Sequence, residues 1–267
     1  YEQKDIFPTT GAAGAIAHAI RAVTKPGDEV LTFAPYFPEY GPYVEGTGAV
    51  LKVVPPQAPA FQPNLDAFEE MLTENVTCVL INTPNNPTGV VYSAETLSRL
   101  ADILTEKSKA FGHNIFLVSD EPYREITYGA EVPWVPDVYD RTLVCYSYSK
   151  SLSLPGERIG WVLVPTTNPD HDELLPAVAG SGRKLGFVCA PSLFQRVVAD
   201  CVDVPSNVGA YASNREALTS GLSRLGYEYI EPQGAFYLWV KALEPDANAF
   251  FLKARAQELL PVPSDSF

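Results

Sequence analysis

The chain has 267 residues, of which 46% are hydrophobic and 19% are charged. This composition is typical of a globular protein with one large domain or two smaller ones. The formal net charge of -13 argues against a nucleic-acid partner, because binding to phosphates requires a basic surface. No apolar run reaches the length of a membrane span, so we expect neither nucleic acid nor a membrane among the partners.

Cysteine and histidine residues are too scattered in the sequence to predict a metal site. None of the cysteines has metal-ligand spacing, and two of them fall in predicted buried strands, which favours a reduced, cytoplasmic protein over a disulfide framework. The cysteines are Cys78, Cys145, Cys189 and Cys201. His18, His113 and His171 lie far apart, so we expect no histidine-based metal site or catalytic triad.

Apolar, β-branched runs alternate with helix-like segments from residue 9 to about residue 165. The expected strands cover residues 29–34, 49–54, 76–81, 115–119, 143–145 and 159–164. Asn64 and Ser93 are the expected N-caps of helices that continue to residue 72 and to about residue 110. This alternation predicts an α/β fold with a mostly parallel sheet flanked by helices and right-handed crossovers.

The pattern changes after about residue 205. Helices are expected over residues 191–203, 206–225 and 247–259, and a strand pair over residues 227–230 and 235–241. We therefore predict a large domain over residues 1–205 and a partial α+β small domain over residues 206–267. The first residue is Tyr1 and the only methionine is Met71, so the chain is expected to be a fragment or to lack its ends.

The stretch Tyr146–Trp161 places a lysine between two predicted strands. Lys150 lies in a loop of small residues, and Arg158 follows eight residues later. A lysine in such a place is poorly solvated, which favours the neutral and nucleophilic amine. Two interpretations remain open from this stretch alone: a lysine that forms a Schiff base, and a surface lysine in a polar turn.

Further polar groups follow other predicted strands. Gly11–Gly14 is a small-residue turn that opens a helix, and such a turn either binds an anion or allows close helix–sheet contact. Asn86 lies in a rigid, proline-rich turn and can donate a directed hydrogen bond. Asp120 and Tyr123 also follow a strand, although a single aspartate there is often only a turn cap. Because ligands of open α/β sheets bind outside the carboxyl ends of the strands, we expect these groups to converge.

Together these groups offer an anion cradle, a neutral donor, a carboxylate, a phenol, a lysine and an arginine. A phosphorylated pyridine aldehyde uses the whole set, with the lysine forming an imine and the carboxylate holding the ring nitrogen protonated. At this point the chain resembles the fold-type I pyridoxal-phosphate enzymes, specifically class I and II aminotransferases of the aspartate aminotransferase type. The stretches that carry the resemblance are Asn85–Gly89, Ser119–Tyr123, Ser147–Lys150 with Gly156–Gly160, and Gly234–Tyr237.

The resemblance implies roles for the reacting groups. Lys150 would hold the cofactor as a Schiff base and act as the acid and base of the proton shift. Asp120 would pair with the pyridinium nitrogen, and Tyr123 and Asn86 would bond the ring oxygen. The same resemblance implies a cis peptide bond between Asn86 and Pro87.

The resemblance also implies a phosphate site and a stacking group. Arg158, Ser147 and the backbone of Ala12 and Ala13 would bind the phosphate, with Ser149 as a further candidate. Phe37 would stack on the cofactor ring. Many relatives have a hydroxylated or indole ring at this position, so a phenylalanine would act through stacking alone.

The implied function is pyridoxal-phosphate-dependent transfer of an amino group between an L-amino acid and a 2-oxo acid through a Schiff base on Lys150. Two alternatives stay open: a C–S lyase of the same fold, and a non-catalytic module or fragment of that fold. The resemblance implies a homodimer, and it places the arginine that clamps the substrate carboxylate beyond residue 267. Arg255 precedes that position and is expected on a helix surface.

Overall fold

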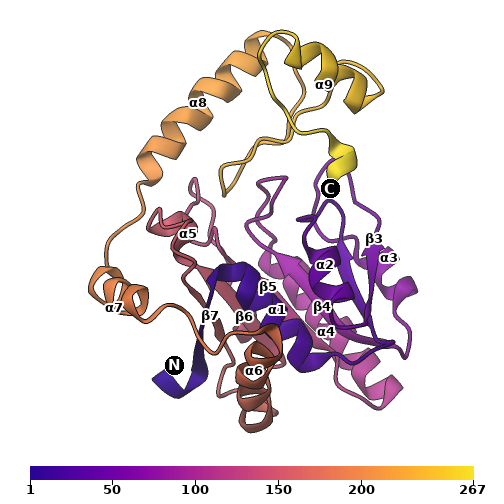
Figure 1. Ribbon diagram of the computed structural model, residues 1–267. Helices are drawn as coiled ribbons and strands as arrows, with labels where there is room; N and C mark the ends of the chain where they lie inside the picture. Colours follow the sequence, from indigo (N-terminus) through magenta and orange to yellow (C-terminus); the bar gives the residue numbers. More distant parts are fainter.

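In the computed structural model, which describes residues 1–267, one sheet of seven strands has the order β1-β7-β6-β5-β4-β2-β3 (Figure 1). The strands are β1 (Ile6–Thr9), β2 (Glu29–Phe33), β3 (Val50–Val54), β4 (Val76–Asn82), β5 (Phe116–Asp120), β6 (Thr142–Ser147) and β7 (Gly160–Leu163). Strands β3, β2, β4, β5 and β6 are mutually parallel, and β7 runs antiparallel to both β6 and β1. The mostly parallel α/β sheet is therefore confirmed. The sequence pattern does not predict β1, a short edge strand that contains Pro8.

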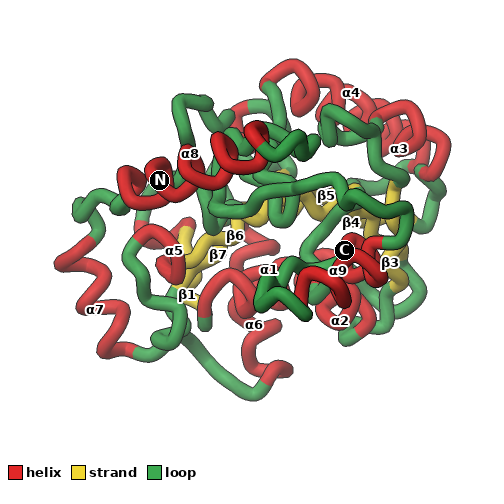
Figure 2. Tube along the Cα trace, turned by 90° about the horizontal axis from the view of Figure 1, so that it is seen from above, coloured by secondary structure: helices red, strands yellow, loops and turns green.

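Helices cover both faces of this sheet. The helices of the chain are α1 (Gly11–Val23), α2 (Tyr40–Glu45), α3 (Leu65–Met71), α4 (Ala94–Phe111), α5 (Tyr148–Ser151), α6 (His171–Leu185), α7 (Ser192–Cys201), α8 (Val208–Arg224) and α9 (Ala247–Arg255), with 3-10 turns at Gln3–Asp5, Val135–Asp137 and Ser264–Ser266. Figure 2 shows α1, α2 and α6 on one side of the strands and α3 and α4 on the other. None of the helices is both long and apolar enough to cross a membrane.

The sheet has an apolar core on each face, as expected for parallel strands buried on both sides. Along β4, Val79 and Ile81 belong to the core beneath α3 and α4, whereas Cys78 and Leu80 belong to the core beneath α1, α2 and α6. All four residues are at most 1% exposed. The continuous apolar run that predicted this strand is thus explained by burial of alternate residues on opposite faces.

Two predicted helix starts are confirmed by their capping bonds. Asn64 Oδ1 accepts a hydrogen bond from Ala67 N at 3.3 Å, and Ser93 Oγ accepts one from Thr96 N at 3.1 Å. Helix α6, in contrast, has no counterpart among the expected helices. It contains Pro176 in its interior and two glycines, Gly180 and Gly182, which lower the helix propensity that a sequence pattern detects.

The strand pair expected over residues 227–230 and 235–241 is wrong as a pair of strands. Only an isolated antiparallel bridge between Tyr229 and Val240 forms there. The reason is that residues 233–235 bond elsewhere: Gly234 N donates to Gly89 O at 3.0 Å, and Ala235 N donates to Ile126 O at 2.9 Å. This segment is therefore attached to the turns that follow β4 and β5.

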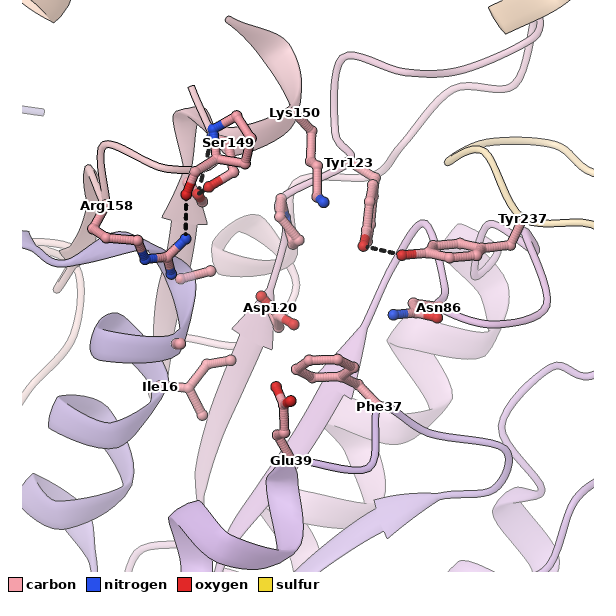
Figure 3. Close-up of a pocket in the computed structure, with 15 residues that line it drawn as sticks. Ile16, Phe37, Glu39, Asn86, Asp120, Tyr123, Ser149, Lys150, Arg158 and Tyr237 are labelled. Carbon is pink, nitrogen blue, oxygen red and sulfur yellow. Dashed lines mark hydrogen bonds between the residues drawn. The ribbon is translucent and has the colours of Figure 1, made fainter. Parts of the chain in front are cut away.

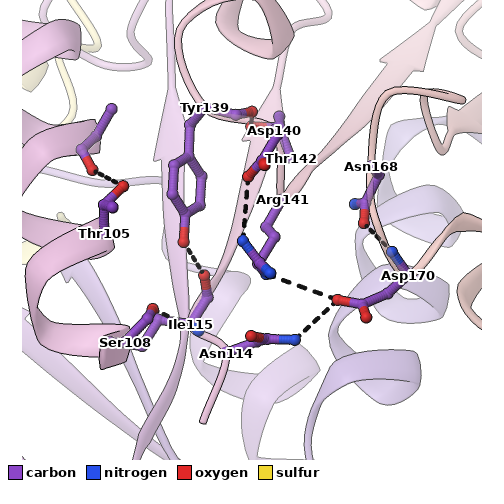
Figure 4. Close-up of polar contacts among 11 residues, drawn as sticks. Thr105, Ser108, Asn114, Ile115, Tyr139, Asp140, Arg141, Thr142, Asn168 and Asp170 are labelled. Atoms are coloured by element: carbon purple, nitrogen blue, oxygen red, sulfur yellow. Dashed lines mark hydrogen bonds and ion pairs between the residues drawn. The ribbon is translucent and has the colours of Figure 1, made fainter. Parts of the chain in front are cut away.

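The amino ends of β5 and β6 carry a polar cluster with a structural role (Figure 4). Tyr139 Oη donates to Ile115 O at 2.7 Å, and Asn114 Nδ2 donates to Asp170 Oδ2 at 2.9 Å. Arg141 Nε lies 3.7 Å from the same Asp170 carboxylate. These bonds join the loops before β5 and β6 to the start of α6, on the edge of the sheet opposite to the predicted site.

Candidate active site

The predicted site residues converge at the carboxyl ends of β4, β5 and β6. They surround a cavity of about 270 Å³ together with the N-terminus of α1 (Figure 3). The ten predicted residues that line it are Ala12, Ala13, Phe37, Asn86, Asp120, Tyr123, Ser147, Ser149, Lys150 and Arg158. The remaining lining residues are Ile16, Glu39, Pro122, Pro155 and Tyr237. Residues up to 225 positions apart in sequence thus meet at one edge of the sheet, as Ala12 and Tyr237 do.

Lys150 projects into the cavity from the short helix α5, which directly follows β6. Ser147, the N-cap of α5, accepts a hydrogen bond from Ser149 N at 3.0 Å and donates one to Ser149 Oγ at 2.6 Å. The expected loop is therefore one helical turn. Burial and the nearby charge of Arg158 lower the pKa of Lys150, which increases its neutral, nucleophilic fraction. The half-buried amine supports the interpretation of a reactive lysine over that of a lysine in a polar surface turn.

Asp120 forms the floor of the cavity and is only 4% exposed. Its Oδ2 atom accepts a hydrogen bond from Tyr40 Oη at 2.7 Å, and Asn82 Nδ2 lies 3.5 Å away. Burial raises the pKa of Asp120 to about 7, the Tyr40 bond opposes this rise, and the neighbouring charge of Glu121 adds to it. Its second oxygen, Oδ1, is buried without a partner from the protein. A buried carboxylate oxygen of this kind is costly unless a ligand donates a proton or a positive charge to it.

Asn86 presents a second unpaired acceptor, because its buried Oδ1 atom has no partner in the protein. Its backbone N donates to Asn82 Oδ1 at 2.6 Å, which fixes the turn relative to β4. The peptide bond between Asn86 and Pro87 is cis, as expected from the resemblance, and so is the bond between Ala34 and Pro35. On the same side of the cavity as Asn86, the hydroxyl of Tyr123 lies 2.7 Å from the hydroxyl of Tyr237 (Figure 3).

The N-terminus of α1 meets Arg158 at the opposite end of the cavity. Arg158 Nη2 donates to Thr10 O at 3.4 Å, and a Cβ atom at Gly11 would lie 2.6 Å from the same Nη2 atom. Gly160 in turn lets β7 approach the start of α1 closely, because a Cβ atom at Gly160 would lie 3.0 Å from Gly11 Cα. Free N–H groups at a helix start and a guanidinium together form a binding site for a doubly charged anion such as a phosphate.

A sequence model of the family described as aminotransferase class I and II matches residues 1–264 of the chain. The chain belongs to this family. The aspartate aminotransferase of Thermotoga maritima is 29% identical over 99% of this chain and 70% of its own length. A probable N-acetyl-LL-diaminopimelate aminotransferase of Bacillus subtilis is 32% identical over 89% of this chain and 58% of its own length. The crystal structure of an amino transferase from Eubacterium rectale is 51% identical, with a TM-score of 0.97, and this chain covers 67% of it.

Class I and II aminotransferases use pyridoxal 5'-phosphate, and the cavity fits this cofactor by the chemistry of its donors and acceptors. The unpaired Asp120 Oδ1 matches a protonated ring nitrogen. Lys150 matches the aldehyde, and Arg158 with the α1 N-terminus matches the phosphate. A ligand with these three groups would satisfy the buried oxygen that the protein alone leaves unpaired.

The sequence predicts no role for three residues around the aminotransferase cavity. Tyr40 and Asn82 both bond Asp120, and Tyr237 bonds Tyr123. Asn82 is the last residue of β4 and pairs in register with Asp120. Its position at the end of a strand could therefore have predicted that it lies beside the site. Tyr40 and Tyr237 meet their partners only through the fold, from 80 and 114 residues away.

Proposed function

We propose that this protein is a pyridoxal-phosphate-dependent transaminase that moves an amino group between an L-amino acid and a 2-oxo acid. The observation that carries the proposal is the convergence of Lys150, Asp120, Asn86, Tyr123 and Arg158 on one cavity with unpaired buried acceptors. The chain spans 58% and 70% of the two curated relatives described above, so its activity and substrates are proposed for the protein that contains it.

When bound, the cofactor would supply an aldehyde carbon and an electron-withdrawing ring. Lys150 Nζ would bond that carbon with loss of water. Once displaced by the amine of the substrate, Lys150 Nζ would accept the proton from the substrate Cα and deliver it to the former aldehyde carbon. Asp120 would keep the ring nitrogen protonated by its negative charge. Its raised pKa in the cofactor-free protein supports this role, because a cationic partner would relieve the cost of burying the charge.

The other lining residues would bind and orient the cofactor. Arg158, the hydroxyls of Ser147 and Ser149 and the backbone N–H groups of Ala12 and Ala13 would hold the phosphate. Tyr123 and Asn86 would bond the ring oxygen. Phe37 would stack on the ring, and its own ring is held edge to face against Tyr40 at 5.7 Å.

We further propose a homodimer and a cytoplasmic location. Exposed apolar side chains around α7 support the first: Leu193, Val202 and Val204 are 64%, 58% and 55% exposed. The free state of all four cysteines supports the second. Light scattering on a size-exclusion column would give twice the chain mass for the proposed homodimer.

The division into domains over residues 1–205 and 206–267 also stays a proposal.

The direct test of the reaction is product analysis. The protein with added pyridoxal phosphate is incubated with a panel of L-amino acids and 2-oxoglutarate, and separately with cysteine conjugates. Formation of glutamate and the matching 2-oxo acid is the expected result. Release of a thiol, pyruvate and ammonia from the conjugates would favour a C–S lyase instead. Cofactor binding with neither reaction would favour a non-catalytic module.

A further inference from the structure

Tyr237 places a second phenol against Tyr123 inside the cavity. The two hydroxyl oxygens lie 2.7 Å apart, and the two rings meet edge to face at 5.6 Å (Figure 3). Tyr123 follows β5, whereas Tyr237 belongs to the segment between α8 and α9. The bond therefore joins the strand end that bears Asp120 to the C-terminal part of the chain.

Backbone bonds hold the segment before Tyr237 in place. Gln233 N and Gly234 N both donate to Gly89 O, at 2.9 and 3.0 Å, and Ala235 N donates to Ile126 O at 2.9 Å. Ala235 is fully buried and has a φ of 58°, a left-handed conformation that is unfavourable for a residue with a Cβ atom. Such a conformation persists only where surrounding contacts enforce it, so the direction of the following side chains is fixed by the fold.

The side chain before Tyr237 also faces a reacting group. Lys150 Nζ lies 5.1 Å from the centroid of the Phe236 ring and 6.0 Å from that of Tyr123. The adjacent residues Phe236 and Tyr237 thus lie next to the amine of Lys150 and the phenol of Tyr123, respectively. This arrangement distinguishes Tyr237 from an ordinary core tyrosine, because its hydroxyl meets a functional hydroxyl within the cavity.

The proton count of the phenol pair leaves one donor free. Burial raises the pKa of both Tyr123 and Tyr237, so both hydroxyls stay protonated at neutral pH. The bond between them uses one of the two protons. The other can be donated to an acceptor in the cavity. The charged groups near the pair are Asp120 and Lys150. Burial and the charge of Arg158, at the other end of the cavity, lower the pKa of Lys150.

We propose that Tyr237 is a positioning residue that donates its proton to Tyr123 Oη and so directs the Tyr123 proton toward the ring oxygen of the cofactor. This inference rests on the proposed function, because it takes the ring oxygen as the acceptor. A hydroxyl that accepts a hydrogen bond becomes a stronger donor, since bonds in a chain polarise one another. Tyr237 therefore stabilises negative charge on the ring oxygen without touching it.

The test compares Tyr237→Phe with Tyr211→Phe in the full chain loaded with pyridoxal phosphate. Tyr211 is a matched control, because its ring stacks on Phe236 at 5.4 Å while its hydroxyl has no hydrogen-bond partner in the structure. We expect Tyr237→Phe to weaken cofactor binding about fivefold, as for loss of one hydrogen bond. It should also raise the pH midpoint of the bound cofactor's absorbance change by about half a unit. Tyr211→Phe should leave both quantities at the wild-type values.

A double-mutant cycle separates this role from a structural one. In a Tyr123→Phe background, Tyr237→Phe should shift neither the dissociation constant nor the pH midpoint further. Equal behaviour of Tyr237→Phe and Tyr211→Phe, or an undiminished shift in the Tyr123→Phe background, would overturn the inference. Failure of the wild-type chain to bind the cofactor would instead overturn the proposed function, and this inference with it.

Discussion

The strand ends around the cavity and the C-terminal part of the chain differ in how their residues are held. Every residue of β6 is buried, whereas α9 has no buried residue and α8 has only Thr219. After residue 205, the other buried positions are Pro232, Gly234 and Ala235, in the segment attached to Gly89 and Ile126. Groups that require exact placement thus lie on the buried sheet edge, and the C-terminal part reaches them through one anchored segment.

The largest expected effect concerns the charge of Asp120. In the cofactor-free protein its pKa is about 7 in the folded state, against an ordinary value of 3.8. The folded state therefore retains a proton that the unfolded chain releases. This contribution to stability is complete below about pH 4 and is lost as the pH rises through 7.

Asp120→Asn removes this titration while keeping an oxygen that can accept from Tyr40. The variant should be more stable than the wild type at pH 8, by up to about 4 kcal/mol, and should lose this advantage near pH 4. Urea unfolding of both cofactor-free proteins across this range measures the difference. A pH-independent difference would show that burial does not shift the Asp120 carboxyl.

Two leucines, one in the sheet and one in the C-terminal part of the chain, test the difference in packing between these regions. Leu80 is fully buried in β4, and Leu252 is 56% exposed on α9. Leu80→Ala should lower the free energy of unfolding by about 3 kcal/mol, because it leaves a cavity between the sheet and α1. Leu252→Ala should change it by less than about 0.5 kcal/mol. Similar losses for the two variants in chemical unfolding would contradict the contrast.

Arg158 tests whether the sheet edge binds the phosphate. Arg158→Ala should weaken pyridoxal phosphate binding about 100-fold, the expected loss for charge-assisted hydrogen bonds to a dianion. Arg99→Ala is the control, since Arg99 pairs with Asp66 on the surface. Fluorescence titration gives both dissociation constants. Binding of pyridoxal without its phosphate should be nearly equal in wild type and Arg158→Ala, and a large loss there would point to misfolding.

The smallest expected effect is the loss of stability when a helix cap is removed, compared for two helices. Ser93 caps α4, which packs on the sheet, and Asn207 caps α8 with a longer bond of 3.4 Å to Ala210 N. Ser93→Ala should lower the free energy of unfolding by about 1 kcal/mol. Asn207→Ala should cost only a few tenths, about 0.3 kcal/mol, because a weakly packed helix end frays locally. A larger loss for Asn207→Ala would show that α8 belongs to the main cooperative unit.

The sheet and most of the site could be predicted because their signals are local. An apolar run marks a strand, and a polar residue at its end or in the turn after it, such as Asp120 or Asn86, must lie at the carboxyl edge of a parallel sheet. The phenols of Tyr40 and Tyr237 gave no such signal, because their bonds depend on side-chain directions across the fold. Residues 235–240 form an apolar, largely aromatic run that is typical of a strand, but the bonds of Ala235 to Ile126 and of Gly234 to Gly89 compete with pairing.

The central claim is that Lys150 is the lysine that binds the cofactor. The most direct measurement is reduction with borohydride in the presence of pyridoxal phosphate, followed by peptide mapping with mass spectrometry. We expect a stable cofactor label on Lys150, retained when the exposed Lys184 is replaced by alanine and lost in Lys150→Ala. A label found mainly on another lysine, or labelling of Lys150→Ala at the wild-type yield, would contradict it.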